Sequence, residues 1–395
     1  MYFTDDEIRQ FRSDTPGCLF KVHLNNAGAS LMPLPVIDAI NRHISLEGNI
    51  GGYEASDYRA GEIDKFYQSA GKLFSCDPVN IAFTANATDS FSRAISSIDF
   101  KPGDVILTSN EDYISNQITY LAFSKRFGVK LIRAKSEEGG GIDLKDFEKC
   151  IRTYHPKLVA ITHIPTNSGL VQPVKEIGEI CSRYELLYLL DACQSVGQMG
   201  LDVNDLKCDF LSVTSRKFLR GPRGAGFLYV SDKALDMGLE PLFIDMRGAD
   251  WVSENEYAPR KGSIRFEDWE FAYALVLGTG AAIDYLLTLS IDNVEKQVKF
   301  LANYARNELS TIDRVSVYDK GQDPGGIVSF HLKGSNPEFI KDALSKKNIN
   351  VATSYRRFAV IDFDEKQIGW TVRVSPHYFN TIEEIDYFLE TVKQL

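Results

Sequence analysis

The chain has 395 residues, a net charge of −10 and six cysteines. This length predicts two or three domains, and the 44% apolar and 25% charged residues are those of a globular protein with a sizeable core. The acidic balance argues against nucleic acid or an anionic membrane as the main partner. From the polar N-terminus we expect no signal peptide, and no apolar run reaches the ~18–20 residues that a membrane helix needs. The cysteines form no CxxC pair, so we expect free thiols and a cytoplasmic protein.

The predicted elements fall into three parts along the chain. Residues 1–20 form a helical arm that packs with the small domain, and Thr4-Asp5-Asp6-Glu7 gives a capping-box start. Residues 21–272 alternate helices with short, often β-branched apolar runs, which predicts an α/β, doubly wound large domain with a mostly parallel sheet. The predicted helices include 34–47 and 61–75, and the predicted strands are 105–108, 130–133, 158–163, 186–190, 210–213 and 226–230.

Residues 273–395 form a smaller α+β domain in this prediction. A long helical region over 273–312 precedes three runs typical of strands, at 327–332, 349–352 and 370–374. A last helix over 381–394 follows Asn380, which we expect to be its N-cap, with Glu383 three residues later.

Two of the apolar runs lead to residues that can carry chemistry. Leu186–Leu190 ends at Asp191, and Phe210–Val213 leads through Thr214-Ser215-Arg216 to Lys217. Because ligands of open α/β sheets bind beyond the carboxyl ends of the strands, both side chains can face one crevice. Asp191 could cap a loop, bind a metal or pair with a pyridinium nitrogen. Lys217 could be a surface lysine or form an imine with an aldehyde.

A third segment, Ile81–Asp89, passes from a short strand into a helix that we expect over about 89–97. The N–H groups of the helix start and the Thr88 hydroxyl can cradle an anion, although an ordinary capped helix has the same pattern. Thr214 and Arg216 can also bind a phosphate. The three segments together supply a lysine for an aldehyde, an acid for a ring nitrogen and donors for a phosphate. These are the requirements of pyridoxal 5'-phosphate (PLP), so we predict a PLP enzyme with its Schiff base on Lys217.

The sequence resembles the class V aminotransferase family of fold-type-I PLP enzymes. The resemblance runs from Leu24-Asn25-Asn26-Ala27-Gly28 to the stretch that begins at Arg373, and its most specific segments are Asp191-Ala-Cys-Gln194 and Thr214-Ser-Arg-Lys217. Three further segments, 51–55, 215–224 and 265–270, look most like the C–S lyases of ergothioneine biosynthesis and the isopenicillin-N-epimerase-like proteins.

The resemblance implies a role for each matching residue. Lys217 would form the Schiff base and later move the Cα proton, Asp191 would pair with the pyridinium nitrogen, and Gln194 would bind the ring oxygen. Tyr113 would stack on the ring, and Thr166 would lie near the ring oxygen, with Asn167 as the alternative. The phosphate would be held by Ala87, Thr88, Thr214 and Arg216, and the substrate by Asn26 and Arg373. Arg373 would grip the α-carboxylate with its bidentate fork, although a salt-bridged or surface arginine is the plainer interpretation.

One departure from the family pattern bears on the activity. Cysteine desulfurases of this family carry a persulfide-forming cysteine on a mobile loop of the small domain, whereas the matching stretch 351–358 has none and no cysteine follows Cys208. We therefore expect Cβ–S β-elimination of a cysteine conjugate or its sulfoxide, giving pyruvate and ammonia. The alternatives are a class V aminotransferase or an amino-acid epimerase. A cysteine desulfurase and a non-catalytic PLP-fold protein rank lower.

The expected partners follow from the same resemblance. They are a small amino-acid substrate and a second copy of the chain, with no nucleic acid, membrane or metal. Such enzymes are homodimers whose sites borrow residues from the partner. We expect the segment from Arg247 to Phe266, which is rich in arginine, glycine and aromatic residues, to contribute residues to the partner's site.

Overall fold

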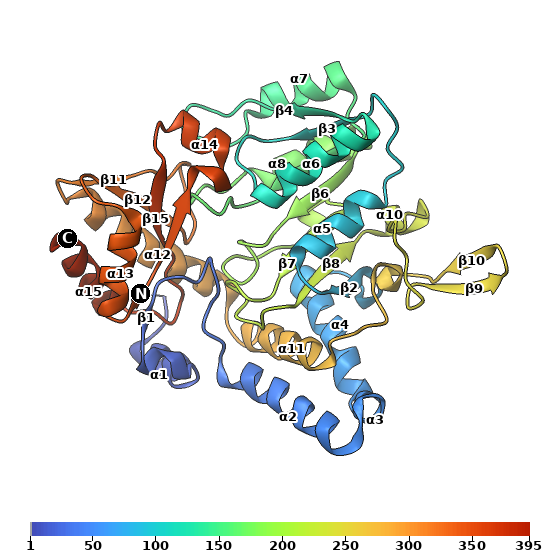
Figure 1. Cartoon of the computed structure of the whole chain (residues 1–395), viewed down its shortest axis with the longest axis horizontal. Coiled ribbons are helices and arrows are strands. Elements are labelled where there is room, and N and C mark those ends of the chain that lie inside the picture. The colour runs from blue at the N-terminus through green and yellow to red at the C-terminus, as the bar shows by residue number, and fades with distance from the viewer. Residues whose placement is uncertain (1) are drawn as a thin grey trace.

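The computed structural model describes residues 2–395 and contains a central seven-stranded sheet (Figure 1). Its strand order is β2-β8-β7-β6-β5-β3-β4, and β8 alone runs antiparallel to its neighbours. The strands are β2 (Ile81–Thr84), β3 (Val105–Thr108), β4 (Lys130–Arg133), β5 (Leu158–Thr162), β6 (Leu187–Asp191), β7 (Phe210–Thr214) and β8 (Gly226–Val230). The predicted doubly wound, mostly parallel α/β architecture is thus confirmed.

Apolar cores cover both faces of this sheet. Successive side chains of a strand point to opposite faces, so in β6 Tyr188 and Leu190 join one core while Leu187 and Leu189 join the other. This two-sided burial explains why the strands are continuous apolar runs without alternation. The helices of this part are α2 (Leu34–Ile50), α3 (Gly52–Tyr58), α4 (Ala60–Phe74), α5 (Ala87–Ser96), α6 (Ile114–Phe127), α7 (Leu144–Tyr154), α8 (Val174–Arg183), α9 (Val203–Leu206), α10 (Asp232–Asp236) and α11 (Tyr273–Leu287).

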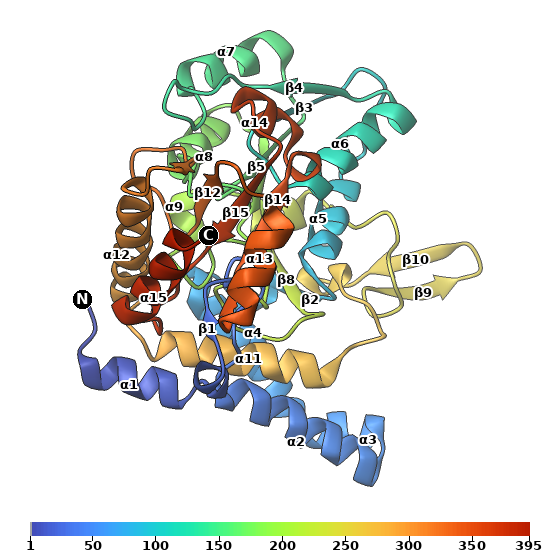
Figure 2. The ribbon, with the colours of Figure 1, turned by 60° about the vertical axis from the view of Figure 1, so that its left-hand side comes forward.

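A second, antiparallel sheet with its own core lies beside the first (Figures 1 and 2). Its order is β11-β12-β15-β14, with β11 (Val315–Val317), β12 (Val328–Leu332), β14 (Ala352–Tyr355) and β15 (Trp370–Val374). Its helices are α12 (Ile291–Ser310), α13 (Pro337–Lys346), α14 (Val360–Glu365) and α15 (Ile382–Lys393). The segment β1 (Val22–His23) pairs in parallel with β13 (Ile349–Asn350), which ties the start of the chain to this part.

The N-terminal arm is the helix α1 (Asp5–Ser13). The expected capping box is confirmed, since the Thr4 hydroxyl accepts from the Glu7 N–H and the Glu7 carboxylate accepts from the Thr4 N–H. Phe11 packs edge-on against Tyr378 at a centroid distance of 5.2 Å, and Arg12 pairs with Glu384 at 2.8 Å. The arm therefore contacts the segment around α15.

The region 273–312 is two helices instead of one. Helix α11 ends at Leu287, and the axis of α12 is bent by 87° from that of α11. α11 packs against α2 and α4, whereas α12 packs against β11 and β12. The boundary at residue 272 stays a prediction. Within residues 2–395 no single helix has the length and apolar character to cross a membrane, and α11 with α12 meets that test only as a bent pair.

Two local predictions need correction. The N-cap of α15 is Thr381, whose hydroxyl accepts from the Glu384 N–H at 3.3 Å, while Asn380 Oδ1 accepts from the His377 N–H at 2.8 Å. Residues 247–266, expected as a loop, contain the hairpin β9 (Ala249–Ser253) and β10 (Glu256–Pro259). The hairpin extends away from the two sheets (Figure 1).

Candidate active site

A cavity of about 330 Å³ opens beyond the carboxyl ends of β5, β6 and β7. Residues from many separate segments line it: Asn86, Ala87, Thr88, Tyr113, Asn116, Thr162, Ile164, Thr166, Asp191, Cys193, Gln194, Thr214, Arg216, Lys217, Arg223 and Gly224. All the residues predicted to hold the cofactor are among them. The parallel strands explain this convergence, because their carboxyl ends meet at one edge of the sheet.

Lys217 is buried in this cavity, three residues beyond the end of β7. A tight turn holds its backbone, since the Arg220 N–H donates to the Lys217 carbonyl at 2.9 Å. Its Nζ lies 5.8 Å from the centre of the Tyr113 ring. Burial lowers the pKa of the Lys217 amine, although the nearby Cys193 and Asp191 oppose the shift. The lowered pKa favours the neutral amine, which is the nucleophilic form.

Asp191 is the last residue of β6 and is held from two sides. Its Oδ1 accepts from the Cys193 N–H at 2.9 Å, and its Oδ2 accepts from the Asn116 side-chain amide at 2.9 Å. Sequence reasoning missed Asn116. It lies on α6, which begins directly after Tyr113, and the polar stretch after β3 was its only signal.

The other end of the cavity is formed by the start of α5. The Asn86 side chain caps this helix by accepting from the Asp89 N–H at 3.0 Å, so the helix begins at Ala87, two residues earlier than expected. In the part of the chain that the structure describes, the N–H groups of Ala87 and Thr88 donate to no protein acceptor. A Cβ on Gly226 would lie 2.9 Å from the Ala87 nitrogen, so glycine lets β8 pack against this turn. Free N–H groups at a helix start suit a phosphate.

Arg373 lies on β15, behind Thr166. One of its terminal nitrogens donates to the Thr166 carbonyl at 2.8 Å and to the Thr166 hydroxyl at 2.5 Å, and the other reaches Asn25 Oδ1 at 3.4 Å. Burial, with a smaller contribution from Arg216, lowers the pKa of Arg373 to about 10. Its Nε has no partner among residues 2–395. A buried guanidinium with free donor capacity fits a carboxylate ligand.

The charge of the cavity region is positive although the chain is acidic. Arg216, Lys217 and Arg223 line the cavity, Arg373 adjoins it only through Thr166, and Asp191 is the one acid among the described lining residues. Within residues 2–395 none of these four basic side chains forms a salt bridge. Such a site fits a ligand with two anionic ends, a phosphate at α5 and a carboxylate at Arg373.

Two of the side chains considered for the site, those of Asn26 and Asn167, form hydrogen bonds inside the fold. Asn26 was predicted to bind substrate, but its amide donates to the Ser375 carbonyl at 2.8 Å and its oxygen accepts from the Ser30 hydroxyl at 2.6 Å. It is therefore used inside the fold, and its neighbour Asn25 reaches Arg373. Thr166 lines the cavity, whereas the Asn167 amide is turned away to bond with Asp362.

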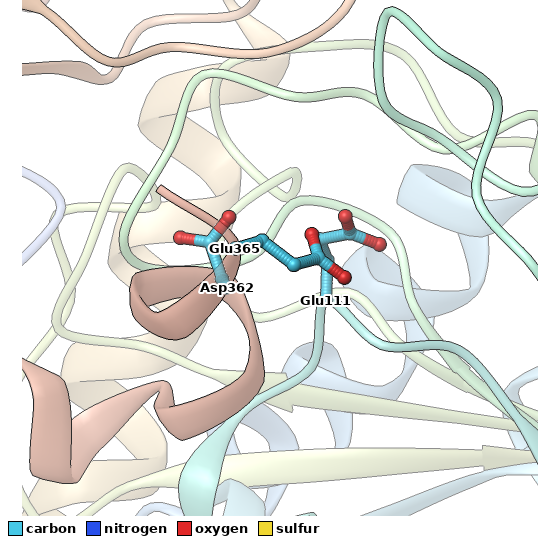
Figure 3. Close-up of side chains that lie close together, drawn as sticks. All are labelled: Glu111, Asp362 and Glu365. Carbon is cyan, nitrogen blue, oxygen red and sulfur yellow. The ribbon is translucent and has the colours of Figure 1, made fainter. Parts of the chain in front are cut away.

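A cluster of acids lies near one of the cavity loops (Figure 3). Glu111 follows β3, Asp362 and Glu365 come from α14, and their carboxylate oxygens lie within 4.8 Å of one another. The Lys320 ammonium contacts them at 2.9, 3.0 and 2.8 Å, respectively. The lysine therefore supplies the cation of this cluster and joins α14 to the loop that leads to Tyr113.

The donor set in the cavity fits PLP. It combines a buried lysine of lowered pKa, a fixed carboxylate, a helix start with free N–H groups, and hydroxyl and guanidinium donors beside it. Each meets a different chemical requirement of the cofactor.

Comparisons with known proteins agree with this fit. The family model described as Aminotransferase class-V matches residues 22–388. A probable cysteine desulfurase of Methanothermobacter thermautotrophicus is 30% identical over 390 residues, with 97% of each chain covered. One from Pyrococcus abyssi is 28% identical, covering 97% of this chain and 96% of the relative. The apo structure of a cysteine desulfurase from Thermococcus onnurineus superposes with a TM-score of 0.89 at 26% identity, covering 98% of this chain and 97% of the other.

These relatives overturn the expected order of activities. The expectation placed Cβ–S elimination from a cysteine conjugate first and desulfuration low, and it is wrong, because the full-length relatives are named cysteine desulfurases. The absence of a cysteine from 351–358 therefore does not exclude desulfuration. By its match over nearly the whole length and by its fold, the chain belongs to the class-V aminotransferase family of fold-type-I, PLP-dependent enzymes.

Proposed function

We propose that this chain removes the sulfur atom of L-cysteine and leaves alanine. The observation that carries the proposal is the full-length similarity to relatives named cysteine desulfurases. The cavity supports it, because its size and its two anion-binding ends suit PLP together with a small amino acid.

Lys217 is the proposed Schiff-base residue and proton carrier. When bound, PLP supplies an aldehyde that captures amino groups and a ring that withdraws electrons from the substrate. Because burial lowers its pKa, the Lys217 amine loses its proton more readily than an ordinary lysine, which would help it to attack that aldehyde and later to accept the Cα proton. Its position 5.8 Å from the Tyr113 ring centre places the amine beside the aromatic wall proposed to cover the cofactor.

The other residues are proposed to bind and orient. Asp191, fixed by two donors, would keep the ring nitrogen protonated, and Thr88 with the free N–H groups of α5 would hold the phosphate. Gln194 donates to the Thr166 hydroxyl at 3.2 Å, and Thr166 in turn contacts Arg373. This chain of contacts would place the substrate carboxylate on Arg373 and the ring oxygen near Gln194.

The sulfur acceptor is proposed to come from outside the chain. Cys193 is the one cysteine on the cavity wall within residues 2–395, and burial raises the pKa of its thiol well above the ordinary value, which disfavours the reactive thiolate. No cysteine follows Cys208. In the proposed reaction the Cβ–S bond breaks, Cβ gains a hydrogen, and the sulfur joins an external thiol as a persulfide. Cysteine and thiol thus give alanine and persulfide, with no other oxidant or reductant.

We further propose a homodimer that works in the cytoplasm. The β9–β10 hairpin and the segment before it expose Phe243 and Trp251 by 83% and 80%, which supports a partner surface there. The six cysteines are all free thiols, which suits a reducing compartment. Light scattering in solution tests the dimer, with a monomer mass as the contrary result.

The activity test uses the PLP-loaded protein with L-cysteine and dithiothreitol. We expect alanine and sulfide in equal amounts, because dithiothreitol accepts the sulfur and then releases it as sulfide. The matched control is Lys217→Ala, which should form neither product. Pyruvate and ammonia in place of alanine, or no turnover by a protein with a normal cofactor spectrum, would overturn the proposal.

A further inference from the structure

A second buried acid, Asp112, lies behind Asp191. It directly precedes Tyr113 and has only 4% of its surface exposed. Its Oδ1 accepts from the Tyr113 N–H at 2.6 Å and from the Thr162 hydroxyl. Its Oδ2 accepts from the Gln117 amide at 2.9 Å. Asp112 does not line the cavity, so it reaches a bound ligand only through other side chains.

Asn116 connects the two acids. Its amide nitrogen donates to Asp191 Oδ2 at 2.9 Å and lies 3.1 Å from Asp112 Oδ1. An amide nitrogen carries two hydrogens, and a carboxylate only accepts, so both contacts require that the NH₂ group faces the acids. The amide therefore links the two carboxylates through hydrogen bonds.

The surroundings of Asp112 contain few other charges. Tyr120 from α6 is buried, and its burial raises the pKa of the phenol. Arg133 from β4 lies one hydrogen bond away, because its guanidinium donates to Gln117 Oε1 at 2.6 Å. Within residues 2–395 neither Asp112 nor Asp191 forms a salt bridge.

Burial is the largest cause that raises the pKa of Asp112 to about 6. The charge of Asp191 adds to this shift, while the hydrogen bonds to Asp112 oppose it. Asp112 is thus neutral below about pH 6 and negatively charged above it. An acid with this pKa changes its charge close to neutral pH.

We propose that Asp112 is a positioning residue that acts through Asn116 on Asp191 and so helps to hold the proton on the cofactor ring nitrogen. The inference rests on the proposed role of Asp191. The Asn116 amide fixes the direction of the Asp191 carboxylate, and the second negative charge behind it strengthens the attraction for a protonated ring.

The test follows the ring nitrogen itself. The protein is loaded with PLP labelled with ¹⁵N in the ring, and the ¹⁵N chemical shift, which reports ring protonation, is recorded from pH 5 to pH 9. With Asp112→Asn the midpoint of ring deprotonation should fall by about one pH unit, because a neighbouring negative charge is lost. The variant and the wild type should agree near pH 5, where Asp112 is neutral, and diverge above pH 6.

Two further variants keep the inference falsifiable. Thr162→Val removes a donor to the charged form of Asp112, so the pH at which its charge affects the ring should rise, even if Asp112→Asn fails to fold. Asp209→Asn is the matched control, because Asp209 is a buried acid that accepts from the Tyr188 N–H at 2.9 Å and does not line the cavity. It should leave the curve unchanged.

The contrary outcomes are separable. If Asp112→Asn or Thr162→Val leaves the wild-type curve unchanged, or if Asp209→Asn moves it as far as Asp112→Asn does, the role of Asp112 is refuted while that of Asp191 stands. If the ring nitrogen is unprotonated in the wild type at every pH, the proposed role of Asp191 fails, and the inference fails with it.

Discussion

The Lys320 cluster gives a sharp test of what holds the two sheets together. In Lys320→Met the ammonium that contacts Glu111, Asp362 and Glu365 is lost. Burial by itself disfavours this ammonium, yet the three acids raise the pKa of Lys320 overall. The variant therefore keeps the acids and removes the charge that balances them.

The free-energy cost of losing the Lys320 ammonium differs among the three carboxylates. Asp362 keeps a second partner, because Lys366 contacts it at 2.7 Å, and Glu365 is 42% exposed. Glu111 has a fully buried side chain and would retain only the Ser136 hydroxyl at 3.1 Å. Because only the Glu111 carboxylate is left buried without a cationic partner, we expect the free energy of unfolding to fall by about 3 kcal/mol, near the lower end of the range for a broken buried ion pair.

This loss converts to a measurable shift in the thermal midpoint. An unfolding entropy of about 2.1 cal/mol/K per residue over 395 residues gives roughly 0.8 kcal/mol per kelvin, so we expect a drop of about 4 °C by calorimetry. Adding Glu111→Gln should restore most of it, since the orphaned charge is then gone. The control Lys346→Met removes an exposed pair and should shift the midpoint by less than about 1 °C. Equal shifts in Lys320→Met and Lys346→Met, or no rescue by Glu111→Gln, would refute the reasoning.

Three more changes test the site and the fold. Arg373→Lys should raise KM for cysteine about tenfold or more, because an ammonium cannot form the bidentate fork, and an unchanged KM in steady-state kinetics would contradict its proposed role. Lys217→Ala should abolish the visible absorbance of the Schiff base while PLP still binds at the phosphate end, and a retained band would point to another lysine. Thr381→Ala should lower the free energy of unfolding by about 1 kcal/mol in a denaturant titration, whereas the exposed Thr153→Ala should have little effect.

The buried strands were predictable because strands that are buried on both faces consist of continuous apolar residues. Leu158–Thr162 and Phe210–Thr214 are covered on both faces, and continuous apolar residues satisfy that environment. The antiparallel direction of β8 has no such signature, since a buried run reads the same in either direction. The β9–β10 hairpin was missed for the opposite reason, because its residues are mostly exposed and show no apolar pattern.

The candidate site was predictable where one motif carries several residues. Asp191 and Gln194, or Thr214 and Lys217, stand close together in the sequence and reach one cavity from one strand end. Asn116 was missed because its importance depends on Asp191, a residue on another strand. A polar side chain that acts through such a contact has no local pattern, so only the assembled sheet identifies it.

The segment 351–358, which lacks a cysteine, and the helix that follows it are held by contacts within the fold. The stretch 351–358, where the family resemblance implies the persulfide-forming cysteine of desulfurases, leads into α14. Lys320 joins α14 to the loop before Tyr113, and Asp362 joins it to Asn167, next to Thr166 on the cavity wall. A sulfur relay within the chain requires both a thiol and the freedom to carry it in and out of the cavity. Residues 351–358 contain no thiol, and Ala352–Tyr355 pair with β15 in the second sheet, which opposes such a movement. The two observations have independent origins, one in composition and one in packing, and both favour an acceptor thiol that enters from solution.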